Sequence, residues 1–178
     1  MAFSKYKSAG FSLIELMIVV VLLGIVASVS FPYFRTMLMN SQIRNATESI
    51  VNGLQKARAE AVKRNLPVKL VLGADSGWIV SCDTVAACPD LVSGVVEQRV
   101  GNEGSANITL VVLPAAATTA TFTNFGGVIT NTDGSASLTQ VDISATGGDK
   151  PLRVQILAGG TARMCDPSLS VTTNPRGC

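Results

Sequence analysis

The chain has 178 residues, of which 47% are hydrophobic and 15% charged, so it can form one domain with a core plus a further apolar segment. Its 14 basic and 12 acidic residues give a net charge of +2. Lys5 and Lys7 account for this excess, because without them 12 basic residues face 12 acidic ones. Whole-molecule charge therefore does not indicate a nucleic-acid-binding protein.

Residues 11–34 form an apolar run that contains one charged residue, Glu15. As a helix, such a run rises roughly 36 Å, which is enough to cross a bilayer core of about 30 Å. A short basic segment, residues 1–10, precedes it, and the bulk of the chain follows. By the positive-inside rule, the sequence predicts a single-pass membrane protein with a cytoplasmic N-terminus and an exported C-terminal domain.

An amphipathic segment, residues 35–65, continues the helical pattern. Its apolar residues recur at helical spacing with charged residues between them, at Ile43, Ala46, Ile50, Leu54, Ala57 and Ala61. Asn65, before Leu66 and Pro67, marks the expected end. The sequence predicts one helix over roughly 12–65, with Gly24 and Pro32 as points of bending or local melting.

Short β-rich runs separated by Gly, Asn, Asp and Ser turns occupy residues 66–178. They read PVKLVL, GWIVSC, GVVEQRV, NITLVVL, TATFTNF, GVIT, SLTQVDIS, PLRVQIL and TARMC. Most alternate apolar and polar residues, which predicts seven to nine strands in antiparallel sheet. The expected fold class is α+β, with a long helix, membrane-spanning and then amphipathic, packed on a β domain.

Four cysteines, Cys82, Cys88, Cys165 and Cys178, form two pairs along the chain. An even number in an exported domain suggests disulfides. Of the three possible connectivities, we favour local pairing, Cys82 with Cys88 and Cys165 with Cys178, because each pair brackets a turn-rich stretch. A four-cysteine zinc site is the less favoured alternative, because neither pair has C-x2-C spacing.

The sequence does not indicate an enzyme. It contains no histidine, which removes Ser-His and Cys-His nucleophile systems. Its aspartates are scattered through turns without EF-hand spacing, and phosphate loops and dinucleotide fingerprints are missing. We expect no catalytic residue, no metal site and no cofactor.

The segment from Gly10 to Glu15, GFSLIE, resembles the type IV prepilin signal, and the match extends through the apolar run to Pro32. The resemblance implies that a prepilin peptidase cuts between Gly10 and Phe11 and that Phe11 is then N-methylated. It also implies that the membrane is the inner membrane and that the C-terminal domain is periplasmic before assembly. Glu15 becomes the fifth and Pro32 the twenty-second residue of the mature chain. Because cleavage precedes the apolar run, the anchor survives it, unlike an ordinary secretory signal.

Glu15 is a candidate assembly residue, because a carboxylate at the centre of a membrane span costs about 2.5–3.5 kcal/mol. The resemblance implies that it meets the methylated amine of Phe11, on its own or a neighbouring subunit, and pairing offsets the desolvation of both charges. Pro32 belongs to the same assembly segment. Two alternatives remain: a simple anchor in which Glu15 is incidental, and a secretory signal cut near Ala27 and Ser28. N-terminal sequencing separates all three.

The C-terminal region is similar to the GspH/FimT group, which includes minor pilins of type IV pili and the H pseudopilin of type II secretion systems. The resemblance is carried by Gly160, Arg163, the run Cys165-Asp166-Pro167 and the run Pro175-Arg176-Gly177-Cys178. It implies a low-abundance subunit that helps to initiate or tip a pilus or pseudopilus, with other minor and major pilins or pseudopilins as partners. Subunits at the apex of such filaments typically lack the membrane glutamate, so Glu15 favours a subapical position.

An alternative function is DNA binding at a pilus tip for natural transformation, since some members of this group bind DNA through an arginine-rich C-terminal motif. Arg153, Arg163 and Arg176 are the candidates here, although no Gly-Arg-x-Arg run is present. A disulfide between Cys165 and Cys178 would bring two of these arginines together. They are otherwise expected to be solvated or paired with Asp166 and the chain terminus.

Overall fold

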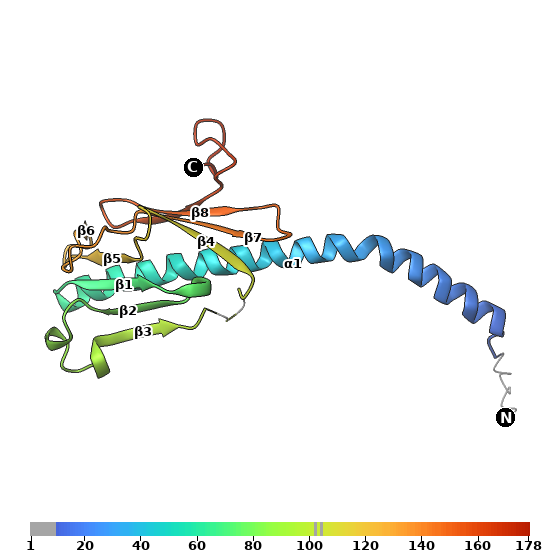
Figure 1. Ribbon diagram of the computed structural model, residues 1–178, viewed down its shortest axis with the longest axis horizontal. Coiled ribbons are helices and arrows are strands. Elements are labelled where there is room, and N and C mark those ends of the chain that lie inside the picture. The colour runs from blue at the N-terminus through green and yellow to red at the C-terminus, as the bar shows by residue number, and fades with distance from the viewer. Residues whose placement is uncertain (1–9, 102, 104) are drawn as a thin grey trace, which may run out of the picture. The chain divides into compact units, whose positions relative to one another are not determined.

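The computed structural model describes residues 10–101, 103 and 105–178 (Figure 1). The expected leader, residues 1–10 with Lys5 and Lys7, lies outside the described residues except for Gly10. The chain divides into two compact units, one ending at Arg35 and the other running from Thr36 to Cys178. One helix, α1 (Leu13–Arg64), contributes residues to both units, and its bounds agree with the predicted helix.

Nine strands follow within the described residues, one in each predicted run. They are β1 (Val68–Leu72), β2 (Trp78–Cys82), β3 (Val95–Arg99), β4 (Ile108–Leu113), β5 (Thr119–Phe122), β6 (Val128–Ile129), β7 (Gln140–Ala145), β8 (Leu152–Ile156) and β9 (Ala162–Cys165). One sheet has the order β3-β2-β1-β5-β6 and the other the order β4-β7-β8-β9. Neighbouring strands pair antiparallel in both sheets, which confirms the predicted α+β class.

A single apolar stripe on α1 faces the inner sides of both sheets, which run alongside this half of the helix (Figure 1). The stripe consists of the six predicted residues from Ile43 to Ala61, each at most 1% exposed. Val68, Leu70 and Leu72 of β1 pack on it from one sheet, and Val141 and Ile143 of β7 do so from the other. Alternate residues of β1 and β7 are buried, so each sheet turns one face to the helix and the other to solvent.

Trp78 fixes how closely the first sheet approaches the helix. Its side chain is 5% exposed, as expected for a core residue, and its Nε1 donates a 2.9 Å hydrogen bond to Ser49 Oγ on α1. A Cβ placed on Gly53 would lie 2.9 Å from the indole ring and 2.9 Å from Leu70 Cδ1. Glycine at this helical position therefore lets the indole lie directly against the backbone of α1.

The C-terminal end of α1 is clamped to the loop that follows β2. Glu60, 7% exposed, accepts hydrogen bonds from Arg64 and Lys63, and Arg64 also reaches Asp90 at 2.9 Å. A disulfide between Cys82 and Cys88 closes this loop beside Arg64. The pair Glu60 and Arg64 uses the i,i+4 spacing seen in the sequence.

Gly53→Ala is expected to destabilise the protein, although alanine is the better helix former. The new methyl group would push into the ring of Trp78, whose position is held by Ser49, and overpacking of this kind costs about 1–3 kcal/mol. Thermal denaturation of the full chain in detergent would measure this change. Asn52→Ala, at the exposed neighbouring position, is the control and should be neutral or slightly stabilising; equal melting temperatures for both variants would contradict the expectation.

The ion pairs that join Glu60, Arg64 and Asp90, here called the clamp, should make the free energy of unfolding depend on pH. Burial raises the pKa of Glu60, but hydrogen bonds from Arg64 and Lys63 outweigh it and hold the pKa below the usual 4.5. The hydrogen bond from Arg64 likewise lowers the pKa of Asp90. Carboxylates with lowered folded pKa values add stability that is present above their unfolded pKa values and is lost as the pH falls through the folded ones.

Denaturant unfolding of the full chain at neutral pH and at about pH 3 should show this loss of stability. Glu60→Gln is expected to lose less stability between the two pH values than the unmodified chain, because glutamine does not titrate. Glu48→Gln, which alters an exposed carboxylate on the same helix, is the control. An unchanged pH dependence in Glu60→Gln would show that the clamp does not carry the effect.

Candidate assembly and binding surfaces

The start of α1 is organised by Ser12 and Glu15. The backbone N–H of Glu15 donates a 3.2 Å hydrogen bond to Ser12 Oγ, so Ser12 caps the helix. The Ser-x-x-Glu spacing is that of a capping box, and a carboxylate in the first turn also suits the helix dipole. Sequence reasoning considered Glu15 only for assembly and overlooked this local role, although the spacing of the two residues could have revealed it.

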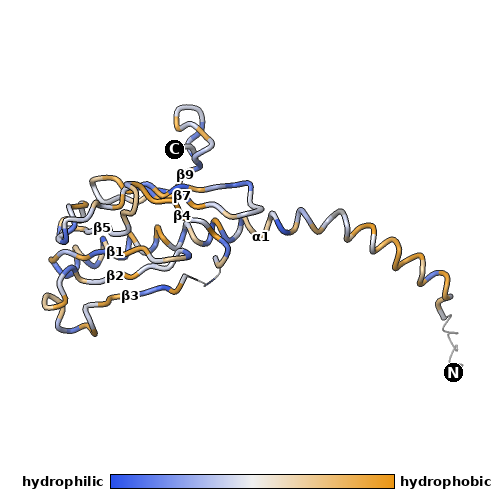
Figure 2. The backbone as a smooth tube through the Cα atoms, viewed as in Figure 1, coloured by the Kyte–Doolittle hydropathy of each residue, from blue (hydrophilic) through white to orange (hydrophobic). Residues whose placement is uncertain are grey.

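The helical residues before Arg35 expose nearly all of their apolar side chains. Sixteen large side chains in this stretch are each between 50% and 85% exposed: Phe11, Leu13, Ile14, Leu16, Met17, Ile18, Val19, Val20, Val21, Leu22, Leu23, Ile25, Val26, Phe31, Tyr33 and Phe34. Figure 2 shows this stretch as the longest hydrophobic part of α1. An exposed apolar surface of this extent marks a place where lipid or other protein chains bind.

A break interrupts α1 within this stretch. No single helix among the described residues is long and apolar enough to cross a membrane, but the bent pair Leu13–Ser28 and Ser30–Arg64 qualifies by length and composition. The break lies one turn before Pro32, whose ring clashes with the carbonyl four residues earlier, that of Ser28. Ser28 Oγ also donates to the carbonyl of Ile25 at 2.8 Å, a contact that favours bending. The expected bend is therefore present, displaced from Pro32 toward Ser28.

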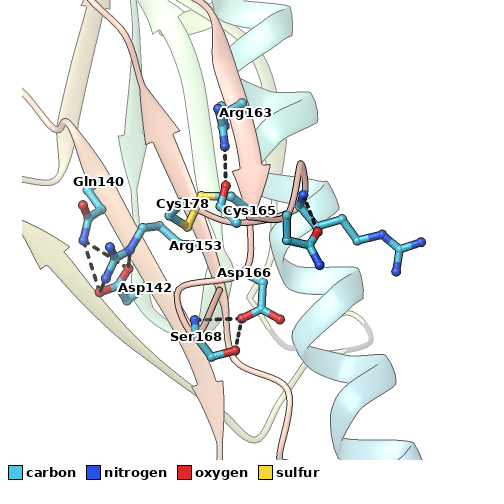
Figure 3. Close-up of a disulfide and its surroundings, with 11 residues drawn as sticks. Gln140, Asp142, Arg153, Arg163, Cys165, Asp166, Ser168 and Cys178 are labelled. Carbon is cyan, nitrogen blue, oxygen red and sulfur yellow. Dashed lines mark hydrogen bonds and ion pairs between the residues drawn. A yellow bond between two sulfur atoms is a disulfide. The ribbon is translucent and has the colours of Figure 1, made fainter. Parts of the chain in front are cut away.

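The second surface is formed by the C-terminal loop, residues 166–178. A disulfide joins Cys165, at the end of β9, to Cys178, so the thiol groups are not available as zinc ligands (Figure 3). The backbone N–H of Asp166 donates to the carbonyl of Arg176 at 2.7 Å. The Asp166 carboxylate accepts hydrogen bonds from the hydroxyl and the backbone N–H of Ser168, which lower its pKa and keep it ionised.

The three candidate arginines are placed differently from one another. Arg153 on β8 forms two hydrogen bonds to the Asp142 carboxylate, at 2.6 and 2.9 Å, and the contact raises the pKa of Arg153 (Figure 3). Arg163 on β9 donates to the carbonyl of Gly177. Within the described residues, the guanidinium of Arg176 makes no ion pair or hydrogen bond. Two of the three side chains are thus engaged in contacts within the domain.

Gly160, part of the C-terminal resemblance, has a structural reason to be glycine. It adopts φ +78°, and a Cβ there would collide with the carbonyl of Gly126. That carbonyl accepts a 3.0 Å hydrogen bond from Arg58 Nε on α1. Gly160 therefore allows two turns to lie against each other at the end of the helix.

A groove of about 730 Å³ lies between α1, the β8 and β9 strands and the C-terminal loop. Its lining comes from four parts of the chain: Asn40, Ser41 and Arg44; Lys150 and Leu152; Met164, Cys165 and Asp166; Pro175 and Arg176. Arg44 pairs with Glu48 at 2.7 Å, an exposed contact of the kind that contributes little to stability. Sequence reasoning grouped arginines by motif and did not find this groove, because its walls are far apart along the chain.

No group of three or more histidine, cysteine, aspartate or glutamate side chains that could hold a metal ion occurs in the part of the chain that the structure describes.

Two family models match the chain. The model described as type II transport protein GspH matches residues 46–160, and the one described as prokaryotic N-terminal methylation motif matches residues 5–31. The second range contains Gly10, Phe11 and Glu15 and ends one residue before Pro32. The first range ends at Gly160, so the C-terminal disulfide loop lies beyond it.

The fold is similar to that of type IV minor pilin FimU of Pseudomonas aeruginosa strain PAO1, known in two crystal forms. One form matches with a TM-score of 0.51 and 20% sequence identity over 71% of this chain and 94% of that chain. The other matches with a TM-score of 0.53 and 19% identity over 73% and 92% of the respective chains. At this identity the likeness shows the pilin fold.

Removing the C-terminal disulfide should loosen the loop without unfolding the core. The bond closes a loop with a sequence separation of 13 residues, and cross-links of this span contribute about 3 kcal/mol. In Cys165→Ser plus Cys178→Ser, limited proteolysis is expected to cut within residues 166–178 well before the strands. Cys82→Ser plus Cys88→Ser, which removes the other disulfide, is the matched control, and the loop of residues 166–178 should stay uncut there. Equal resistance of the loop in both variants would contradict the expectation.

Proposed function

The chain belongs to the GspH family of type II transport proteins, and on this premise we propose that it is a minor pilin or pseudopilin that helps to initiate or tip a filament. The family and fold are those of structural pilins rather than enzymes. The N-terminal methylation motif together with the exposed apolar start of α1 carries the proposal. These two features indicate a membrane-anchored pilin that is built into a filament.

Processing between Gly10 and Phe11 is the first step of the proposed function. While the bond is intact, the nitrogen of Phe11 is an uncharged amide. Cleavage by a prepilin peptidase converts it into an amine, which carries a positive charge at neutral pH. The proposed partner of Glu15 therefore exists only after cleavage, so an unprocessed subunit cannot make the assembly contact.

Docking through Glu15 is the second step. Its side chain is exposed at the first turn of α1, and the cap from Ser12 occupies the backbone N–H of Glu15 while leaving the carboxylate available. In an apolar surrounding, the carboxylate and the amine of Phe11 from a neighbouring subunit stabilise each other, whereas either alone costs several kcal/mol. Other pilins or pseudopilins, minor and major, are the partners. Because Glu15 is present, a subapical position in the filament is favoured over the apex.

The expected orientation places residues 1–10 in the cytoplasm and the β domain in the periplasm before assembly. Lys5 and Lys7 before the apolar run support this orientation through the positive-inside rule. The two disulfides support it independently, because such bonds persist in an oxidising compartment.

DNA binding at a pilus tip is the alternative, and the arrangement of the arginines gives it less support. Arg153 is held by Asp142, and Arg163 by the carbonyl of Gly177. DNA phosphates would have to displace Asp142 and the Gly177 carbonyl from these two arginines. Arg176 lies in a groove that also contains the Asp166 carboxylate, which would repel the phosphates. The structural role of the subunit is therefore the function we propose.

Processing and assembly can be tested separately with two substitutions in the full chain. Mass spectrometry and N-terminal sequencing of the protein from a host with prepilin peptidase should give Phe11, N-methylated, as the first residue. Gly10→Leu is expected to accumulate as the uncut precursor. Glu15→Gln should be cut and methylated normally, but its incorporation into filaments should fall at least tenfold, because loss of one partner of a buried pair costs about 3–5 kcal/mol.

Glu48→Gln provides the control for Glu15→Gln, since it removes an exposed carboxylate elsewhere on α1 and should leave incorporation unchanged. A mature protein that begins at any other residue would refute the processing step. Normal incorporation of Glu15→Gln would refute the docking step. A deletion strain scored for surface pili and for protein secretion assigns the subunit to one machine or the other.

A further inference from the structure

The groove between α1, β8, β9 and the C-terminal loop has no role in the assembly steps described above. We propose that it binds the head group of phosphatidylethanolamine, a phospholipid that carries both a phosphate and a primary ammonium. Binding would occur while the subunit is anchored in the membrane, before it enters a filament. This inference rests on the membrane anchoring of the proposed function and adds a specific lipid contact to it.

The length of the connecting chain limits how far the groove can lie from the apolar run. Asn40 and Arg44 line the groove, and Asn40 lies only six positions after Phe34, the last residue of the apolar run. Six residues span at most about 20 Å, and about 9 Å where they are helical. The two head-group layers together add about 10–15 Å to the thickness of a bilayer core, so each layer is about 5–8 Å thick. A groove tethered this closely to the anchor is within reach of lipid head groups.

The residues at the end of the apolar run are those that mark a membrane interface. Tyr33 and Phe34 are 77% and 56% exposed, and Arg35 follows directly. Aromatic side chains gather at the level of lipid head groups, where the ring is in contact with the acyl chains and the polar edge with water. The Arg35 guanidinium lies over the ring of Phe31, 5.6 Å from its centre. The anchor therefore ends immediately before the residues that lead into the groove.

Charges of both signs line the groove. Arg44, Lys150 and Arg176 are the cations, and within the described residues the side chains of Lys150 and Arg176 make no hydrogen bond or ion pair. Arginine and lysine are the usual partners of phosphate oxygens. Asp166 is the one carboxylate in the lining, and the hydrogen bonds from Ser168 keep it charged and fixed in place. Three cations suit a phosphate, and the carboxylate suits an ammonium.

The balance of charge argues against a polyanion as the occupant. Beside the groove, Glu48 is paired with Arg44, and Asp149 accepts a hydrogen bond from Asn40 at 2.7 Å. These two carboxylates and Asp166 together equal the three cations in number. A nucleic acid carries phosphates without cations, so the Asp166 carboxylate would repel it. A head group with an ammonium would instead be attracted to this carboxylate. Leu152 and Met164 add apolar surface to the lining, which suits the glycerol and upper acyl part of a lipid.

The test uses the full chain in a mild detergent and measures lipid binding by native mass spectrometry. Phosphatidylethanolamine, phosphatidylcholine and phosphatidylglycerol are added in turn at equal concentrations. We expect phosphatidylethanolamine to bind about tenfold more tightly than phosphatidylcholine, whose quaternary ammonium cannot donate a hydrogen bond to Asp166. Lys150→Ala plus Arg176→Ala should weaken binding of phosphatidylethanolamine about tenfold.

Two further variants separate the lipid site from general effects of charge. Lys56→Ala plus Lys63→Ala removes two cations far from the groove lining and should bind lipid like the unmodified chain. Asp166→Asn keeps an acceptor for Ser168 but removes the negative charge, and it should lose the preference for phosphatidylethanolamine over phosphatidylcholine. This change of preference does not depend on the stability of the double variant, so the proposal can be judged even if that variant fails to fold.

Three results would overturn the proposal. They are equal binding of phosphatidylethanolamine and phosphatidylcholine, an equal loss of binding in both double variants, and DNA binding that requires Lys150 and Arg176 while lipid binding is absent. Failure of the proposed function would appear elsewhere, as a mature chain that does not begin at Phe11 or is not found in the membrane fraction. Lipid binding in detergent is measured independently of both.

Discussion

The apolar stripe of α1 from Ile43 to Ala61 is the contact on which the rest of the domain depends. Two sheets bury their inner faces against it, so one face of one helix joins strands from the beginning and the end of the β region. Small residues make this possible. Ala46, Ala57 and Ala61 are fully buried, and Gly53 lets the ring of Trp78 lie against the helix backbone. The stripe therefore fixes where the two sheets lie on this part of the helix.

The same helix has a second apolar surface before Arg35, which remains exposed among the described residues of its unit. Glu15 lies at the start of this surface, where it belongs to the helix cap and is the proposed assembly residue. Its backbone N–H is bound by Ser12, which begins the helix, and its carboxylate remains available for a partner. In the proposed function, cleavage creates the amine of Phe11, so docking would follow processing in a fixed order. Under this proposal, the precursor would not assemble before it is cleaved.

Tertiary contacts decide which of the three candidate arginines are free to bind a ligand. Arg153, Arg163 and Arg176 look alike in sequence, but Asp142 holds the first and the Gly177 carbonyl the second. The disulfide between Cys165 and Cys178 folds the loop back on β9 and places Arg176 opposite α1. The resulting groove combines Arg176 with Lys150, Arg44 and Asp166 rather than with the other two arginines. Its charge pattern is mixed, and this distinguishes it from an arginine-rich surface for nucleic acid.

The sequence by itself determined the helix, the nine strand positions, the buried stripe and the processing motif, because each depends on local spacing: 3.6-residue periodicity, alternation, or a short contiguous signal. It also contained the Ser12 and Glu15 cap, which was overlooked. Only the tertiary structure decided the division of the strands into two sheets, the partners of the arginines and the existence of the groove. These features join residues up to 136 positions apart, such as Asn40 and Arg176, and no local pattern records which distant segments meet.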